Sequence, residues 1–138
     1  MKKILFILVA FLAFSCCSSK LTEKVEVAFP NGQPQIVRYY DRNGVCVKQT
    51  EYYESGQVYK EGGIKNDVEE GEWHAYFPDG RLQVLGYFKD GKRTGASTVY
   101  YPTGQLYMEG FYKEGHHCGK WKFYDEQGYL LREDDYGE

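Results

Sequence analysis

The side chains that most often carry out chemistry in proteins are few in this chain. Three histidines occur among 138 residues, and two of them form the run His116-His117-Cys118. Adjacent residues of a strand point to opposite faces, so this run does not easily direct both imidazoles at one metal ion. No second ligand pair follows at zinc spacing. We expect a solvated loop here rather than a metal site.

Paired carboxylates that could act as general acid and base occur at Glu69-Glu70 and Asp134-Asp135. The first pair lies at a turn and the second in the C-terminal tail, where charges are ordinarily solvated. No nucleophile elbow, phosphate-binding loop or paired-histidine helix accompanies them. The sequence therefore predicts a protein that is not an enzyme, with no catalytic residue, no cofactor and no bound metal.

Composition favours a surface of aromatic side chains instead. The chain contains 14 Tyr, 8 Phe and 2 Trp together with 16 Gly, and 42% of its residues are apolar. This content suits a single folded domain and is poor for a helical bundle. The net charge of −3 argues against nucleic acid as a partner, because such binding requires a basic surface.

Glycines and aromatic residues recur at a fixed interval of 24 residues, which indicates a linear repeat architecture. The main glycine series is Gly32, Gly56, Gly80, Gly104 and Gly128. The main aromatic series is Tyr52, Tyr76, Tyr100 and Tyr124. Ser97 stands midway between Trp73 and Trp121, at the same place in its copy. The first copy is degenerate and the last is truncated, as expected for the ends of an array.

Each repeat contains two turn signals separated by runs of strand length. One is exemplified by Phe77-Pro78-Asp79-Gly80, in which Pro presets one turn residue and Gly accepts a positive φ. The other is a two-residue signal, as in Asp90-Gly91 and Glu114-Gly115. We predict an all-β protein of about four tandem hairpins that form an elongated, twisted, single-layer antiparallel sheet.

Alternation along the strands predicts which residues share a face. Trp73, Ala75 and Phe77 fall on one side of their strand, and Leu82 and Val84 fall together on the return strand. Both faces carry aromatic residues, and a single layer has nothing to cover one of them. We predict a candidate binding face of five aromatic residues, with a purely structural role as the alternative. They are Trp73, Phe77, Tyr101, Trp121 and Phe123.

The copy from Gly86 to Gly95, continued by Tyr100-Tyr101 and Gly104-Gln105-Leu106, resembles the bacterial variant of the MORN repeat. The copy from Gly110 to Gly128 has the same pattern, and the resemblance covers roughly residues 25–138. It implies hairpin repeats that act as scaffolds or membrane-associated interaction modules. Bacterial proteins of this kind often carry the label YwqK-type antitoxin, which implies an alternative in which the protein neutralises one cognate partner.

Cys46 and Cys118 occupy the same repeat position, three copies apart. With two strands a copy and about 4.8 Å between strands, they are expected to lie roughly 29 Å apart along the array. A disulfide requires Cα atoms within about 7 Å of each other. The sequence therefore predicts two thiols that are not joined within one chain.

The first twenty residues are typical of a targeting segment. Lys2 and Lys3 precede an apolar run from Ile4 to Phe14, which is shorter than the roughly 20 residues of a membrane span. The run Leu12-Ala13-Phe14-Ser15-Cys16 resembles the bacterial lipoprotein cleavage box, which implies cleavage before Cys16 and acylation of its sulfur and amine. An ordinary secretory signal with an incidental cysteine pair is the alternative.

Three segments follow from these patterns: a lipoprotein signal peptide at 1–15, a lipidated Cys16 with a polar tether at 16–24, and a repeat domain at 25–138. We predict a non-enzymatic lipoprotein of the cell envelope, held in the outer membrane and facing the periplasm. It would present its repeats to an unidentified protein partner. A glycan-binding module that uses Trp73 or Trp121 is a further alternative.

Overall fold

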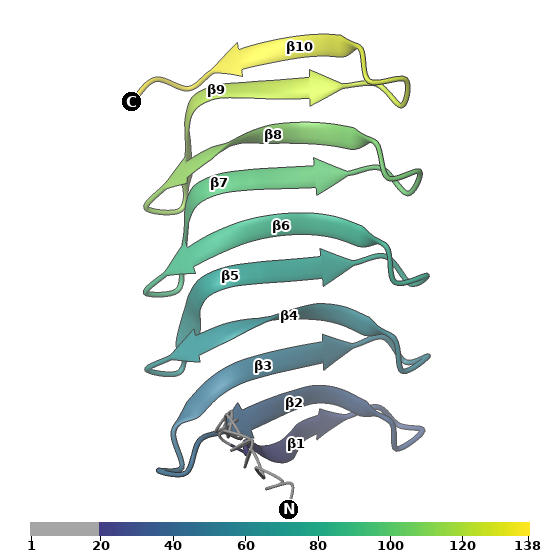
Figure 1. Ribbon diagram of the computed structural model, residues 1–138, viewed down its shortest axis with the longest axis vertical. Helices are drawn as coiled ribbons and strands as arrows, with labels where there is room; N and C mark the ends of the chain where they lie inside the picture. The colour runs from purple at the N-terminus through teal and green to yellow at the C-terminus, as the bar shows by residue number, and fades with distance from the viewer. Residues whose placement is uncertain (1–19) are drawn as a thin grey trace, which may run out of the picture.

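The computed structural model describes residues 20–138, which form one open antiparallel sheet of ten strands (Figure 1). Each strand pairs with the next one along the chain, so the sheet order is the sequence order. The strands are β1 (Thr22–Ala28), β2 (Pro34–Tyr40), β3 (Cys46–Tyr52), β4 (Val58–Lys65), β5 (Val68–Tyr76), β6 (Leu82–Lys89), β7 (Lys92–Tyr100), β8 (Leu106–Lys113), β9 (His116–Tyr124) and β10 (Leu130–Asp135). The predicted single-layer hairpin fold is confirmed.

The array contains five hairpins rather than about four. The difference lies in the degenerate first copy, which forms the complete hairpin β1–β2, with Val25 paired to Val37. β1 begins at Thr22, within the segment expected to be a tether. The targeting segment and Cys16 lie outside the described residues. No helix within residues 20–138 is long and apolar enough to cross a membrane.

Two kinds of turn occur in the sheet, and they alternate from β3 onward; the β2–β3 turn, from Asp41 to Val45, is of the wider kind like those on either side of it. In the wider kind the Gly80 amide donates to the Phe77 carbonyl and the Phe77 amide donates to the Arg81 carbonyl, both at 2.8 Å. In the tighter kind both central residues have positive φ, as at Asp90 (49°) and Gly91 (77°). Such turns match the right-handed twist of the strands that they join. Because the chain reverses at each turn, successive turns lie at opposite edges of the sheet.

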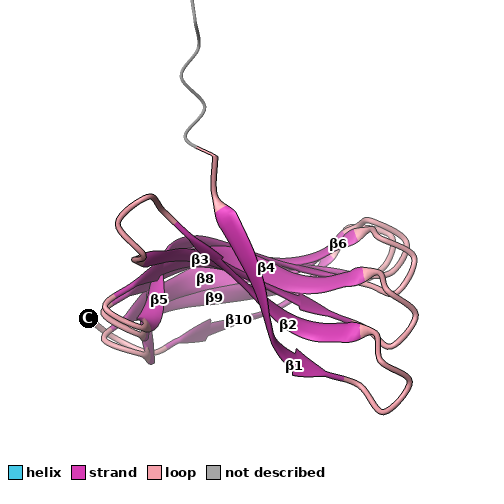
Figure 2. Ribbon diagram, turned by 90° about the horizontal axis from the view of Figure 1, so that it is seen from below, coloured by secondary structure: helices cyan, strands magenta, loops and turns pink. Residues whose placement is uncertain are grey.

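A bulge interrupts every pair of strands and changes which residues share a face. Leu82 pairs with Tyr76, whereas Val84 pairs with Ala75. Because directly paired residues share a face and Ala75 and Tyr76 are neighbours, Leu82 and Val84 lie on opposite faces. The prediction that they share a face is wrong. Figure 2 shows the accompanying twist, with β1 crossing the direction of the later strands.

The core of the single layer is thin and discontinuous. The buried apolar side chains are Val37, Cys46, Ile64, Trp73 and Trp121. Cys46, Ile64 and Trp73 form one cluster, against which Tyr40 and Phe88 pack. Cys46 and Cys118 lie on β3 and β9, six strands apart, and both are free. This separation confirms that they are not joined to each other within one chain.

Candidate functional site

We call the side of the sheet that carries Trp73, Ser97 and Trp121 the tryptophan face. Each tryptophan lies flat against a glycine of the preceding strand: Trp73 against Gly62, and Trp121 against Gly110. A Cβ atom placed on either glycine would fall within 3.0 Å of ring atoms, closer than real Cβ atoms approach. We refer to each such pair of positions as a clamp.

Hydrogen bonds fix the orientation of both indole rings. Trp73 Nε1 donates to the Gly63 carbonyl at 3.0 Å, and Trp121 Nε1 donates to the Phe111 carbonyl at 3.1 Å. The exposed fractions of the two side chains are only 2% and 1%. Burial with a satisfied N–H is typical of a packing residue. The structure thus places these two members of the predicted binding face inside the fold rather than at a contact surface.

The other two clamp positions in the array are filled differently. In the first copy Arg38 stands in place of the glycine and Gln49 in place of the tryptophan, and Arg38 Nε donates to Gln49 Oε1 at 3.0 Å. In the third copy both residues are small, because Gly86 lies opposite Ser97. The nearest atom to a Cβ built on Gly86 is Ser97 Oγ, at 3.8 Å. Only this clamp has no large or hydrogen-bonded pair within residues 20–138.

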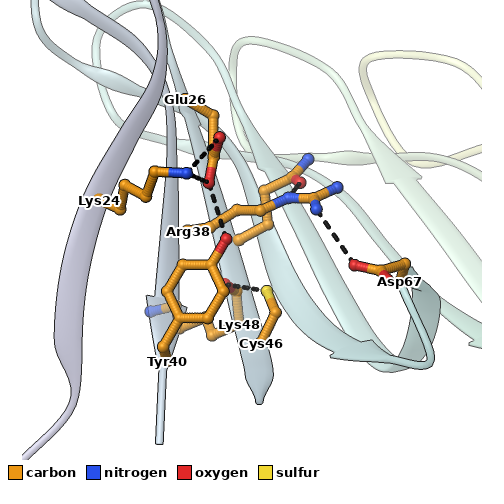
Figure 3. A network of polar contacts seen from close by, with 8 residues as sticks. Lys24, Glu26, Arg38, Tyr40, Cys46, Lys48 and Asp67 are labelled. Carbon is orange, nitrogen blue, oxygen red and sulfur yellow. Dashed lines mark hydrogen bonds and ion pairs between the residues drawn. The ribbon is translucent and has the colours of Figure 1, made fainter. Parts of the chain in front are cut away.

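Polar contacts close the N-terminal end of the tryptophan face (Figure 3). Tyr40 Oη donates to Glu26 Oε1 at 2.7 Å, and Lys24 forms an ion pair with the same carboxylate at 3.0 Å. Arg38 also pairs with Asp67 at 3.3 Å. β1 begins before the predicted repeat boundary because Thr22 and Glu23 already pair with Tyr40 and Tyr39 of β2. The hydrogen bond from Tyr40 to Glu26 adds a side-chain contact between the two strands.

A hollow of about 300 Å³ lies on the tryptophan face between β4 and β7. Its apolar wall includes Trp73, Val84 and Phe88 around Gly86. Lys60 and Arg93 border it with positive charge. Lys60 Nζ lies 4.5 Å from the Trp73 ring centroid and is also paired with Glu69. An aromatic wall beside cations suits a planar group that carries negative charge nearby.

The three remaining predicted binding residues are half-buried. Phe77 and Tyr101 directly follow β5 and β7, and Phe123 lies on β9, two residues after Trp121. Tyr101 Oη donates to the Tyr124 carbonyl at 2.9 Å, which ties its turn to the next copy. Whether these residues bind a partner stays a prediction.

The structure adds Tyr107, which sequence reasoning did not select. Its ring lies 4.9 Å from that of Tyr101 and 6.3 Å from that of Phe123, and 37% of its surface is exposed. The bulge between β7 and β8 turns Tyr107 toward the tryptophan face, a position that strict alternation along β8 does not indicate. Tyr107 links Tyr101 and Phe123 into an aromatic edge of which Tyr107 is the exposed member.

The run His116-His117-Cys118 begins β9 rather than forming the expected loop, and His117 packs among aromatic rings. The ring of His117 lies 4.1 Å from that of Trp121 and 4.8 Å from that of Tyr136, with Nε2 at 3.1 Å from Tyr112 Oη. Across residues 20–138, no three His, Cys, Asp or Glu side chains are grouped so that they could hold a metal ion.

The opposite side of the sheet, which we call the tyrosine face, is held by hydroxyl–carboxylate contacts. Tyr76 Oη donates to Glu61 at 3.2 Å, and Lys48 pairs with the same carboxylate at 2.7 Å. The hydrogen bond from Lys48 lowers the pKa of Glu61 below its usual value. Burial, with the hydrogen bond to Tyr39, raises the pKa of Tyr52 to about 12. Both shifts move titration away from neutral pH, the opposite of what acid–base catalysis needs.

Comparison with known families identifies three copies of one repeat in the chain. Residues 46–66, 69–90 and 93–114 match the MORN repeat variant, and each match spans a pair of neighbouring strands. MORN repeats are non-catalytic modules that generally mediate contacts with proteins or membranes. A comparison with curated proteins gives no match.

Proposed function

We propose that this chain, which carries three MORN repeat variants, is a lipid-anchored protein of the cell envelope that presents its tryptophan face to another protein. The observation that supports this role is the aromatic edge of Tyr101, Tyr107 and Phe123, with the exposed ring of Tyr107 at its centre. A hollow of about 300 Å³ lies on the same face, between β4 and β7. Aromatic residues are enriched at protein interfaces, because each joins a large apolar body to a polar tip.

The architecture supports a rigid presenting surface. Successive hairpins fix the spacing of equivalent side chains, so contact groups recur along the array at the interval of two strands. The buried tryptophans hold neighbouring strands together. The aromatic side chains that remain partly exposed on the same face can contact a partner. The single layer leaves apolar surface uncovered, which in soluble proteins marks contact sites.

The proposed anchor is the acylated Cys16, in the outer membrane and facing the periplasm. We expect Cys16→Ser to abolish incorporation of a labelled fatty acid and to shift the protein out of the membrane fraction, because stable anchoring requires two or more acyl chains. Cys17→Ser is the matched control and should behave as the wild type. Loss of label in Cys17→Ser with retention in Cys16→Ser would show that the acylated residue is Cys17. Label in both variants would refute a lipid anchor at either cysteine.

The contact face is tested by a pair of variants on β8. Tyr107 is exposed on the tryptophan face, and Phe111, with 55% of its surface exposed, lies on the tyrosine face. In crosslinked capture from native membranes, we expect Tyr107→Ala to weaken recovery of the partner by about tenfold or more. Phe111→Ala should recover it as the wild type does.

Circular dichroism of both variants provides the folding control. Loss of the partner in Phe111→Ala alone would move the contact to the tyrosine face. Failure of the wild type to capture any protein, or retention of polysaccharide instead, would refute a protein-presenting role.

A further inference from the structure

The clamp positions vary along the array in a way that singles out one copy. Gly62–Trp73 and Gly110–Trp121 are each filled by an indole ring, and Arg38–Gln49 is closed by a hydrogen bond. Gly86–Ser97 has neither. The register of the strands is nonetheless the same as in the next copy, since Gly86 pairs with Trp73 on the preceding strand as Gly110 pairs with Ser97.

The hollow beside Gly86 has the size and walls of an aromatic site. Its volume of about 300 Å³ is lined by Val84 and Phe88 on β6 and by Trp73 on β5. An apolar cavity of about 150 Å³ already binds benzene in another protein, so this space is sufficient for a larger bicyclic ring. Ser97, only 3% exposed, places a single side-chain oxygen near Gly86, 3.8 Å from a Cβ built there.

The backbone supplies a matching acceptor. The two tryptophans donate their N–H to the carbonyls of Gly63 and Phe111, each one residue after the clamp glycine. The counterpart in the third copy is the carbonyl of Tyr87, one residue after Gly86. An indole seated in this copy would thus find the acceptor that the other two indoles use.

Charge at the rim distinguishes this copy from its neighbours. Arg93 is exposed, and no ion pair is found for it among the described residues. Its guanidinium carbon lies 5.5 Å from the Phe88 ring centroid and 5.3 Å from that of Tyr112. The residues at the same position of the neighbouring copies are already engaged, because Glu69 pairs with Lys60 and the ring of His117 packs against that of Trp121. Arg93 is therefore available to a carboxylate of an incoming group.

The geometry points to a binding site, over Gly86 and opposite Ser97, for a tryptophan side chain of a partner polypeptide that carries a carboxylate next to it. The partner's indole completes the clamp that Ser97 leaves open, and Arg93 binds the carboxylate. This inference rests on the proposed function, because it names the group by which a partner protein would be held.

The test is an NMR titration of the full repeat region with N-acetyltryptophan, which carries both the indole and the carboxylate. We expect saturable shifts of the Gly86, Phe88 and Arg93 amides. Ser97→Trp places an indole over Gly86 from β7 and should abolish these shifts. If that variant fails to fold, Gly86→Leu fills the same space from β6 and should abolish them as well. N-acetylalanine, which lacks the ring, should give no such shifts.

A second arm tests the charge. N-acetyltryptophanamide lacks the carboxylate and should bind about tenfold more weakly, and Arg93→Gln should weaken N-acetyltryptophan to the level of the amide. Equal binding of the two probes would overturn the role of Arg93. No shifts in the wild type, or unchanged shifts in both filled variants, would overturn the site.

These results separate the inference from the proposed function. Partner capture that survives Ser97→Trp would overturn the indole site alone and leave the presenting role intact. N-acetyltryptophan binding without capture of any protein would overturn the polypeptide source and, with it, the presenting role.

Discussion

Gly110→Ala is expected to unfold at a clearly lower urea concentration than the wild type, whereas Gly86→Ala is expected to be neutral or slightly stabilising. A methyl group on Gly110 collides with the buried ring of Trp121, which is 1% exposed and hydrogen-bonded through its N–H, so the ring has no free space to move into. Overpacking of this kind costs about 1–3 kcal/mol.

Gly86→Ala is the matched control, because it makes the same change at the same place one copy earlier. Its added Cβ would meet only Ser97 Oγ, at 3.8 Å. Alanine also loses less backbone entropy on folding than glycine, by about 0.5–1 kcal/mol within a strand. Equal unfolding midpoints for the two variants would show that the tryptophan is not held against the glycine.

Trp121→Ala is expected to lower the free energy of unfolding by about 3–5 kcal/mol, the cost of removing a large buried aromatic side chain. The indole is in contact with the rings of Tyr112 and His117, at centroid distances of 5.0 and 4.1 Å, and all three lose packing together. Repeat arrays depend on contacts between neighbouring units, so the damage should concentrate at the C-terminal end.

Hydrogen exchange measures that distribution. In Trp121→Ala the amides of β8 to β10 should lose protection first, while those of β2 to β4 keep it. Tyr129→Ala, at a side chain with 73% of its surface exposed, is the control and should change little. Uniform loss of protection over the whole sheet would contradict a contribution confined to neighbouring strands.

Most of the fold could be predicted from the 24-residue period of the sequence. Glycine and proline at fixed places specify hairpins, and short connections between successive hairpins favour a sheet in sequence order. The turn Asn66-Asp67 was missed because neither residue is glycine, although both have positive φ, 51° and 62°. The face of Leu82 was wrong because a bulge adds one residue without leaving a mark in the sequence.

The candidate site was less predictable than the fold. Alternation correctly grouped Trp73 and Trp121 on one face. A pattern of apolar residues does not tell whether a side chain on that face is buried or exposed, and both of these are buried. The glycines at 62 and 110 carried that information, since a ring needs a neighbour without a side chain in order to lie flat. Ser97 was visible as a break in the tryptophan series, and its meaning follows only from what lies opposite.

The most direct test of the open clamp is a double-mutant cycle of Gly86→Ala and Ser97→Trp, followed by urea unfolding. We expect Ser97→Trp alone to be tolerated or stabilising, because Gly86 opposite it carries no side chain and borders a hollow of about 300 Å³. Gly86→Ala should then cost about 1–3 kcal/mol in the Ser97→Trp background, although it is harmless in the wild type. Additive effects of the two substitutions would show that no indole lies over Gly86, and the clamp in this copy would not be an open one.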